Sequence, residues 1–208
     1  MYPVNLKMKG LPCLVIGGGH IAVRKVKKLL LEDAEVTVLA PEISPELMQY
    51  FREKRISWQQ ASYRKGDAKG YRFVVTACGI RQVAEWVHEE SLLQSFLYNA
   101  ADFPPLGNCS LPAAFETGGI HFAISTDGRS PAMAKYVKNW LKGRIPPAFG
   151  VWLDKAALLR EELRNEIADS RDRERFWHMV FDDEIISGKL DEAEERVRNA
   201  VGCFRSES

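Results

Sequence analysis

Residues 11–41 read LPCLVIGGGHIAVRKVKKLLLEDAEVTVLAP and contain the pattern of a strand, a glycine turn, a helix and a second strand. The apolar run Cys13–Ile16 shows no alternation of polar and apolar residues, which is typical of a strand covered on both faces of a sheet. The helix is expected from about His20 to Leu31, and the second strand from Val36 to Leu39. The segment therefore indicates a βαβ unit with two parallel strands.

The glycine turn matches the dinucleotide-binding pattern G-x-G-x-x-A, from Gly17 to Ala22. Gly17 allows a tight turn out of the strand, Gly19 lets a pyrophosphate approach the backbone, and Ala22 keeps the helix close to the sheet. The free N–H groups and the positive end of the helix dipole would hold the phosphates. We therefore predict a nucleotide site here; the alternative interpretation is a purely structural glycine turn.

The end of the second strand favours NAD over NADP as the nucleotide. The chain continues Ala40-Pro41-Glu42, and no Arg or Lys follows directly to hold a 2′-phosphate. Ala40 and Pro41 would pack against the adenosine, while Glu42 comes slightly late to bind the ribose.

Further along the chain, apolar runs alternate with helical patterns at the spacing of a doubly wound, Rossmann-type parallel sheet, which is an α/β fold. Strands are expected at residues 56–60, 71–77 and 96–99, and helices at 45–54 and 80–93. Ligands of such sheets bind beyond the carboxyl ends of the strands. Four segments should therefore meet at this edge: residues 17–22, 40–41, 76–79 and 99–102.

The second half of the chain has too few expected strands for a sheet of its own. One strand is expected at residues 120–125, before a turn and a helix that begins at Pro131 with Ser130 as its N-cap. The rest of the chain looks helical, and exposed aromatic residues on such elements favour a dimer-forming region. We predict an NAD-binding domain at residues 1–112, a dimerisation region at 113–146 and a C-terminal helical domain at 147–208.

Composition argues against several functional classes. The formal net charge is +1, so the chain has no basic footprint for nucleic acid. The stretch MYPVNLKMKG lacks the apolar core of a signal peptide, and no apolar run approaches the ~20 residues that span a bilayer. The four cysteines and four histidines lack ligand spacing, which favours reduced thiols over a zinc site. We therefore expect a cytoplasmic protein without nucleic-acid, membrane or resident metal partners.

Four stretches of the chain together carry a family resemblance. They read GGGHIAVRKVKKLLLEDAEVTVLAP, NAADFP, FAISTDGRSPAMAKYVKNWL and RERFWHMVFDD. They resemble the precorrin-2 dehydrogenase family, which is also that of the N-terminal module of siroheme synthase, here in its stand-alone form. The resemblance implies a homodimer with an NAD-binding Rossmann domain, a dimerisation region and a C-terminal helical domain. It also implies NAD-dependent oxidation of precorrin-2 to sirohydrochlorin; some members additionally insert Fe²⁺ to make siroheme.

The resemblance also implies roles for individual residues. The key carboxylate of the family falls on Asp102, in an N-x-x-D motif after the fifth strand. An S-[ST]-x-G-x-S-P turn at residues 125–131 falls near where the tetrapyrrole binds. Together with the carboxyl edge of the sheet, this gives candidate cofactor-binding residues Gly17, Gly19, His20, Ile21, Ala22, Ala40, Pro41 and Thr76, and candidate substrate-binding residues Ser125, Thr126, Arg129 and Ser130.

Two segments depart from the family pattern. Members often read T-D/N-D after the fourth strand, where this chain has Thr76-Ala77-Cys78-Gly79. The stretch from Ser110 to Gly119 differs from the usual F-x-x-P-A-x-x-x-R-G pattern and lacks its Arg. These departures concern cofactor contacts and substrate orientation. A catalytically silent NAD-binding module is therefore an alternative to the dehydrogenase.

Dehydrogenation of a reduced tetrapyrrole requires a hydride acceptor, which is NAD⁺, and a base, for which Asp102 is the candidate. The alternative for Asp102 is an acid that only stiffens its turn, and the alternative for Ser130 is an N-cap alone. An enzyme that also inserts iron, with Asp102 as the base for both reactions, is a further alternative. The cations of the first helix are expected mostly on its exposed side: Arg24, Lys25, Lys27 and Lys28.

Overall fold

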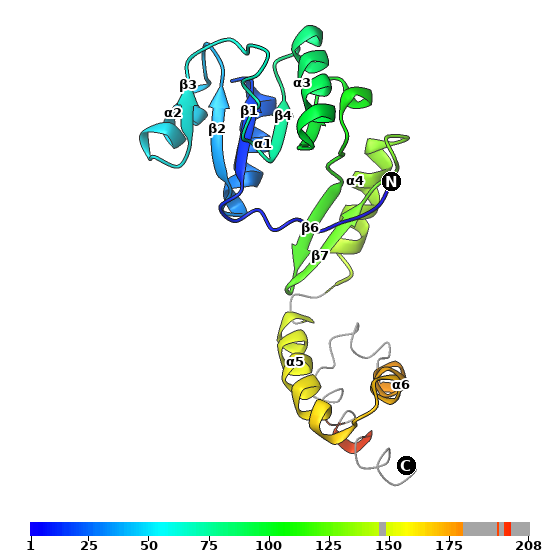
Figure 1. Cartoon of the computed structure of the whole chain (residues 1–208). Coiled ribbons are helices and arrows are strands. Elements are labelled where there is room, and N and C mark those ends of the chain that lie inside the picture. The colour runs from blue at the N-terminus through cyan, green and yellow to red at the C-terminus, as the bar shows by residue number, and fades with distance from the viewer. Residues whose placement is uncertain (146–148, 181–194, 196–197, 201–208) are drawn as a thin grey trace. The chain divides into compact units, whose positions relative to one another are not determined.

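The computed structural model describes residues 1–145, 149–180, 195 and 198–200, and the chain divides into two compact units, Met1–Leu111 and Pro112–Ser208 (Figure 1). The first unit is an α/β domain, and the second combines a β-hairpin with helices. Within the described ranges, every helix is too short or too polar to span a membrane.

The first unit is built on a five-stranded sheet in the order β3-β2-β1-β4-β5. The strands are β1 (Pro12–Ile16), β2 (Glu35–Leu39), β3 (Ser57–Gln59), β4 (Phe73–Thr76) and β5 (Leu97–Ala100). Every neighbouring pair is parallel. The chain starts at the central strand β1, moves outward through β2 and β3, and then crosses to β4 and β5. This topology confirms the predicted doubly wound sheet.

Helices connect the strands of the first unit: α1 (His20–Leu31), α2 (Pro45–Arg52) and α3 (Arg81–Gln94), with a short 3-10 helix η1 (Pro104–Leu106) after β5. The start of α2 follows from its sequence, because Ser44 Oγ accepts a hydrogen bond from the N–H of Leu47 at 3.4 Å. Pro45 occupies the first helical position, where its missing N–H costs nothing.

Alternate residues of the strands pack into two separate cores, one on each face of the sheet. Cys13 and Val15 lie in the core that contains the apolar face of α1, whereas Leu14 and Ile16 lie in the core that contains α3. All four side chains are at most 2% exposed. Burial on both faces explains why the strand shows no alternation, and each large apolar side chain buried in this way contributes about 1.5–3 kcal/mol.

The second unit begins with a β-hairpin of which only one strand is expected from the sequence. β6 (Ala113–Thr117) and β7 (Ile120–Ile124) are antiparallel, and Gly118 and Gly119 join them with φ of 55° and 73°. The expectation that no strand precedes residues 120–125 is wrong. Pro112 would disrupt a strand, but β6 starts one residue after it and so does not include the proline. The rings of Phe115 and Phe122 stack across the pair, with centroids 4.7 Å apart.

Helices make up the rest of the second unit: α4 (Pro131–Lys142), α5 (Phe149–Glu166) and α6 (Ser170–Val180). The start of α4 is the predicted one, because Ser130 Oγ accepts a hydrogen bond from the N–H of Met133 at 3.2 Å. A small buried cluster joins α5 to α6 through Leu159, Leu163, Ile167 and Phe176. The expected breaks at Pro146 and Pro147, and most of the expected helix beyond Val180, lie outside the described residues.

Candidate functional site

The glycine turn between β1 and α1 makes close backbone contacts that only glycine permits. Gly17 has φ of +128°, and a Cβ there would collide with the carbonyl oxygen of Ala77. A Cβ at Gly18 would collide with the carbonyl oxygen of Glu42. A Cβ at Gly19, in contrast, would meet nothing within 4 Å. The turn is therefore fixed at its first two glycines and open at the third, where a pyrophosphate needs to approach the backbone.

The loop that follows β2 is fastened to the same turn. The N–H of Ser44 donates to the carbonyl oxygen of Gly18 at 2.9 Å. The indole N–H of Trp58 donates to the carbonyl oxygen of Ala40 at 3.0 Å, and Ala40 is buried while Pro41 is exposed. These bonds hold Ala40 and Pro41 at the edge of the sheet that also carries the glycine turn.

The first turn of α1 has backbone donors that no side chain uses. Gly19 is the N-cap of the helix and offers no side-chain acceptor, and both Gly19 and His20 are exposed. The first N–H groups of a helix lack partners within the helix, so those of His20, Ile21 and Ala22 are available to an anion. Together with the open side of Gly19, this arrangement fits the diphosphate of a dinucleotide.

Thr76 lies at the carboxyl end of β4, but its polar atoms are used within the protein. Its Oγ1 lies 2.9 Å from the hydroxyl of Tyr98, which donates to the carbonyl oxygen of Ala84 at 3.1 Å. The carbonyl oxygen of Thr76 accepts a hydrogen bond from the N–H of Ala101 at 3.0 Å. Thr76 is also only 1% exposed, so any contact with a cofactor would be a van der Waals contact.

Asp102 is half-buried just beyond the carboxyl end of β5 and is tied to the loop after β4. Its Oδ2 accepts a hydrogen bond of 2.7 Å from the N–H of Gly79, which has φ of +69°. The other oxygen, Oδ1, has no hydrogen-bond partner among the described residues. The guanidinium of Arg81 lies 5.9 Å from the ring centre of the adjacent Phe103. Asp102 thus stiffens its turn with one oxygen and leaves the other free to accept a proton.

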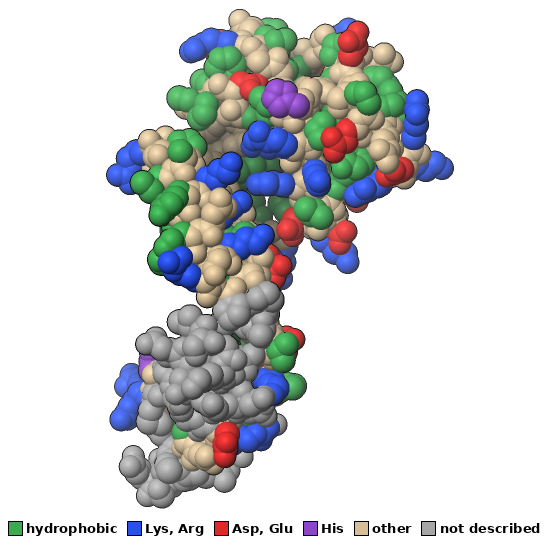
Figure 2. Space-filling view, turned by 180° about the vertical axis from the view of Figure 1, so that it is seen from behind, with side chains coloured by type: hydrophobic (Ala, Val, Ile, Leu, Met, Phe, Trp, Pro, Cys, Tyr) green, Lys and Arg blue, Asp and Glu red, His purple; other side chains and the backbone are tan. Residues whose placement is uncertain are grey.

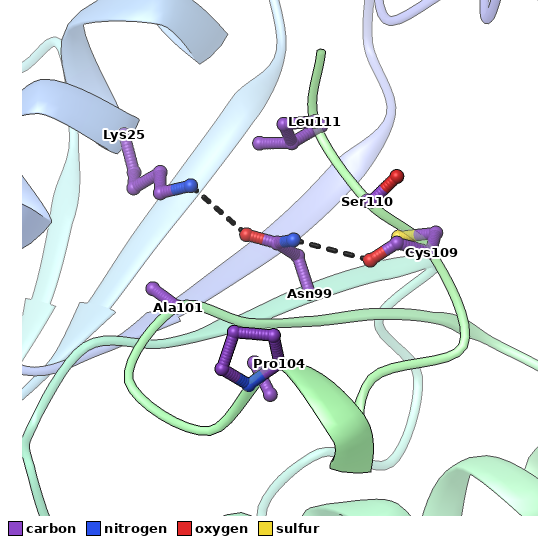
Figure 3. Close-up of a pocket in the computed structure, with 8 residues that line it drawn as sticks. Lys25, Asn99, Ala101, Pro104, Cys109, Ser110 and Leu111 are labelled. Carbon is purple, nitrogen blue, oxygen red and sulfur yellow. Dashed lines mark hydrogen bonds between the residues drawn. The ribbon is translucent and has the colours of Figure 1, made fainter. Parts of the chain in front are cut away.

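A cavity of about 190 Å³ in the first unit reaches Ala101 and Pro104, on either side of Asp102 (Figure 3). Lys25 extends from α1 toward Asn99, and its Nζ donates to Asn99 Oδ1 at 2.9 Å. Asn99 Nδ2 donates in turn to the carbonyl oxygen of Cys109 at 3.1 Å. The cavity is lined by Lys25, Asn99, Ala100, Ala101, Pro104, Cys109, Ser110 and Leu111.

The expected exposure of Lys25 is wrong, and the sequence contained a signal for its true position. Residues three and four apart share one face of a helix. Lys25 lies three residues after Ala22 and four before Leu29, and both of these residues are buried. Lys25 therefore falls on the apolar stripe of α1 and not on its solvated side.

Burial keeps the thiols of the first unit neutral. It raises the pKa of Cys13 to about 12 and that of Cys109 to about 11, although the Lys25 ammonium acts to lower the latter. Burial also raises the pKa of Cys78, which follows β4. These thiols are therefore not activated nucleophiles near neutral pH. In the part of the chain that the structure describes, no three His, Cys, Asp or Glu side chains come together as metal ligands.

The predicted substrate-binding turn lies in the second unit, and its groups bond to one another. Ser125 Oγ accepts from the N–H of Asp127 at 3.2 Å, and Thr126 Oγ1 accepts from the N–H of Ser130 at 3.1 Å. Arg129 Nε donates to the carbonyl oxygen of Thr126 at 3.1 Å. Each hydroxyl is used here as an acceptor, so its own O–H remains for an anionic ligand. The structure groups these residues together within the second unit, and the cofactor-site candidates all belong to the first unit.

Known proteins resemble this chain over most of its length. Residues 4–113 match the model of a protein family described as "Putative NAD(P)-binding". The chain is 32% identical over 203 residues to the siroheme synthase of Nitrosococcus oceani, a match that covers 96% of this chain. It is 31% identical over 203 residues to the siroheme synthase of Methylococcus capsulatus. A solved structure titled "SirC, precorrin-2 dehydrogenase" matches with a TM-score of 0.76 and 28% identity.

The share of each relative that is matched differs. The chain spans 43% of the length of both siroheme synthases. The match to the precorrin-2 dehydrogenase structure covers 96% of this chain and 98% of that one, and so includes both units of the fold. The chain therefore belongs to this NAD(P)-binding family, and over both of its units it is similar to a precorrin-2 dehydrogenase and to part of the siroheme synthases.

Proposed function

We propose that this protein oxidises precorrin-2 to sirohydrochlorin and uses NAD⁺ as the hydride acceptor. The observation that carries the proposal is the position of Asp102, whose carboxylate is held by the N–H of Gly79 at the carboxyl ends of β4 and β5. The glycine turn lies at the carboxyl end of the neighbouring strand β1. A base and a dinucleotide site on one edge of a parallel sheet are what a dehydrogenase needs. The likeness to a precorrin-2 dehydrogenase over both units supports the choice of substrate.

The residues that would hold the cofactor are those of the glycine turn and of the loop after β2. The N–H groups of His20, Ile21 and Ala22 would bind the diphosphate, with Gly19 giving it room. Ala40 and Pro41 would pack against the adenosine. We propose NAD rather than NADP because no Lys or Arg follows Pro41 directly to pair with a 2′-phosphate. The cofactor supplies the chemistry of accepting a hydride.

Asp102 would take the proton that leaves the substrate. The substrate loses two hydrogens, one with its electron pair to the nicotinamide and the other as a proton to Asp102 Oδ1. The hydrogen bond from Gly79 to Oδ2 holds the carboxylate in place and leaves Oδ1 as the acceptor. Release of that proton to water returns Asp102 to its starting state.

The remaining parts of the proposal concern the substrate turn, assembly and location. Ser125, Thr126, Arg129 and Ser130 would donate hydrogen bonds to the carboxylates of the substrate, and Arg129 would add positive charge. We also propose that the protein is a homodimer. We propose that it works in the cytoplasm, because the cysteines of the described residues, Cys13, Cys78 and Cys109, are all free thiols.

The test is anaerobic turnover by the purified protein. Precorrin-2 is generated enzymatically without oxygen, the protein is added with NAD⁺ or NADP⁺, and the absorption spectrum of sirohydrochlorin is followed. We expect sirohydrochlorin to form with NAD⁺ and more slowly with NADP⁺. If NAD⁺ binds in a calorimetric titration but precorrin-2 is never oxidised, the protein is a silent NAD-binding module and the proposal is wrong.

A further inference from the structure

The ammonium of Lys25 is partly withdrawn from water without a carboxylate partner. Lys25 is half-buried, and its recorded hydrogen bond goes to the neutral amide of Asn99. No Asp or Glu among the described residues forms an ion pair with it. A lysine ammonium has three N–H donors, so two remain after the bond to Asn99. Withdrawing a cation from water costs free energy when its N–H groups lack partners, and an anion that accepts hydrogen bonds from them offsets that cost.

The position of this ammonium is fixed by a buried amide. Asn99 is 7% exposed, and its Nδ2 is bonded to the carbonyl oxygen of Cys109, so that Oδ1 must face Lys25. The same amide therefore links α1, β5 and the segment that returns after η1 (Figure 3). The Nζ of Lys25 is held in advance at one wall of the cavity, which lowers the entropy cost of binding a ligand there.

The cavity is large enough for more than a water molecule. Its volume of about 190 Å³ is well above the roughly 10–15 Å³ that a single water needs. The Lys25 ammonium lies on its wall beside apolar Pro104 and Leu111, and the hydroxyl of Ser110, which also lines it, donates to Met1 Sδ at 3.2 Å. A carboxylate on a short hydrocarbon arm suits such a lining, because the charge would meet the ammonium and the methylenes would meet the apolar residues.

The charges around Lys25 favour an anion. Its pKa is lowered chiefly by burial, then by the positive charges of Lys28 and Arg24, while Cys109 and the Asp102 carboxylate act to raise it. Positive neighbours thus outnumber the single carboxylate nearby. On the face of the molecule that Figure 2 shows, Lys and Arg side chains are interspersed with Asp and Glu side chains. An incoming carboxylate would relieve this repulsion.

We propose that the cavity between α1 and β5 is a subsite for one carboxylate arm of the tetrapyrrole substrate, with Lys25 as its anchor and Asn99 as the residue that positions Lys25. This inference rests on the proposed function and adds a specificity-determining residue to it. Ala101 and Pro104 line the cavity, and Asp102 lies between them in the chain, so an arm held by Lys25 would orient the macrocycle toward the base.

The test compares tetrapyrrole and cofactor binding in matched variants. Lys25→Met removes the charge and keeps an apolar stem of similar length, and Lys25→Arg keeps the charge. Lys27→Met removes the same charge from an exposed position of the same helix. Binding of uroporphyrin, a stable polycarboxylate tetrapyrrole, is followed by its fluorescence, binding of NAD⁺ by calorimetry, and folding by thermal melting.

We expect Lys25→Met to weaken uroporphyrin binding and to raise the KM for precorrin-2 by about tenfold, with kcat within about twofold, as for the loss of one charge-assisted hydrogen bond. Lys27→Met should change the uroporphyrin affinity and the KM for precorrin-2 by less than about twofold. Lys25→Arg should restore most of the affinity, and NAD⁺ binding should be unchanged in all variants. Should Lys25→Met fail to fold, Lys25→Gln takes its place.

Three results would overturn the subsite. Lys25→Met with wild-type tetrapyrrole affinity and KM would mean that the ammonium only supports Asn99. If Lys25→Met lost only NAD⁺ binding, the cavity would belong to the cofactor site. If the wild-type protein bound no uroporphyrin and showed no saturation with precorrin-2, it would have no tetrapyrrole subsite at all. The proposed function fails separately, when wild-type protein binds the tetrapyrrole through Lys25 but never oxidises precorrin-2.

Discussion

The proposed function gives Asp102 two tasks that can be separated by substitution. Its Oδ2 joins the loop after β4 to the end of β5 through the N–H of Gly79, and its Oδ1 is free of protein partners among the described residues. The first task is structural and needs only a hydrogen-bond acceptor. The second needs a group that can take up a proton, which a carboxylate can do and an amide cannot.

We predict that Asp102→Asn keeps the fold and loses the reaction. The amide oxygen of Asn can still accept from Gly79, so the melting temperature should change by no more than a few degrees. Loss of a general base should lower kcat for precorrin-2 oxidation by about 10²–10⁴-fold with little change in KM. Steady-state kinetics and thermal melting measure the two effects.

The matched control is Asp33→Asn. Asp33 is exposed, follows the C-terminus of α1, and has a left-handed φ of 55° that Asn tolerates well. It should leave both kcat and the melting temperature unchanged. An Asp102→Asn enzyme as fast as wild type would leave the reaction assignment intact and remove Asp102 as the base.

The pH dependence of tetrapyrrole affinity gives a second test at Lys25. Burial and the charges of Lys28 and Arg24 lower its pKa below the usual 10.5, so its ammonium loses its proton earlier than an exposed lysine as the pH rises. As the pH rises, affinity for a polycarboxylate should therefore already fall at pH values below 10.5. In Lys25→Arg the fall should be absent, since arginine stays protonated. Identical pH profiles for the two proteins would contradict the prediction.

The glycine turn is the element that was easiest to predict from sequence. Its requirements are local: Gly17 needs a positive φ, and the helix must start directly after Gly19. The strand–turn–helix–strand pattern contains all of that information within residues 11–41, so the βαβ unit and the predicted nucleotide site follow from it, while the rest of the sheet follows from the strand patterns further along the chain.

Two other features escaped prediction because they depend on residues far apart in the chain. The spacing of Lys25 to Ala22 and Leu29 already indicates that it lies on the buried side of α1, but its hydrogen bond depends on Asn99, which is 74 residues away and whose orientation is set by Cys109. The strand β6 depends on its pairing with β7 and on the stacking of Phe115 on Phe122, neither of which a single alternating segment reveals. Local pattern was therefore sufficient for the sheet and insufficient for the cavity.

The glycines of the turn should respond differently to alanine. Gly17→Ala places a side chain at φ of +128° and against the backbone of Ala77, so we predict a loss of stability of about 1–3 kcal/mol or more. Gly19→Ala meets no atom of the protein within 4 Å and should leave the melting temperature nearly unchanged. Because its methyl group would occupy the space of the diphosphate, it should weaken NAD⁺ binding by roughly 5–100-fold.

Thermal melting and calorimetric NAD⁺ titration distinguish these outcomes. Gly10→Ala, at φ of +69° with nothing within 4 Å, is the control for backbone strain without a collision. If Gly19→Ala binds NAD⁺ as tightly as wild type, the diphosphate does not lie at this turn.

For the molecule as a whole, the surface of α4 bears on the predicted dimer. Met133, Tyr136 and Trp140 recur at helical spacing along this helix and are 53%, 65% and 46% exposed. Large apolar side chains grouped on one helix face are typical of an interface. The homodimer stays a prediction, and this face of α4 is where we expect a part of the interface.

Light scattering during size-exclusion chromatography measures the assembly. The wild-type protein should show about twice the chain mass of 23.6 kDa. Tyr136→Lys should shift the mass toward that of one chain, whereas Leu31→Lys, at a residue 73% exposed at the end of α1, should not. A wild-type mass of a single chain at micromolar concentration would argue against the dimer.

The central claim, that this chain couples a dinucleotide site to the oxidation of a tetrapyrrole, is tested most directly by the stoichiometry of the reaction. NADH and sirohydrochlorin are measured together in anaerobic mixtures of wild-type protein, precorrin-2 and NAD⁺. We predict one NADH for each sirohydrochlorin, at a rate proportional to enzyme concentration and lost in Asp102→Asn. Sirohydrochlorin that forms without NADH, or equally fast without the protein, would contradict the account.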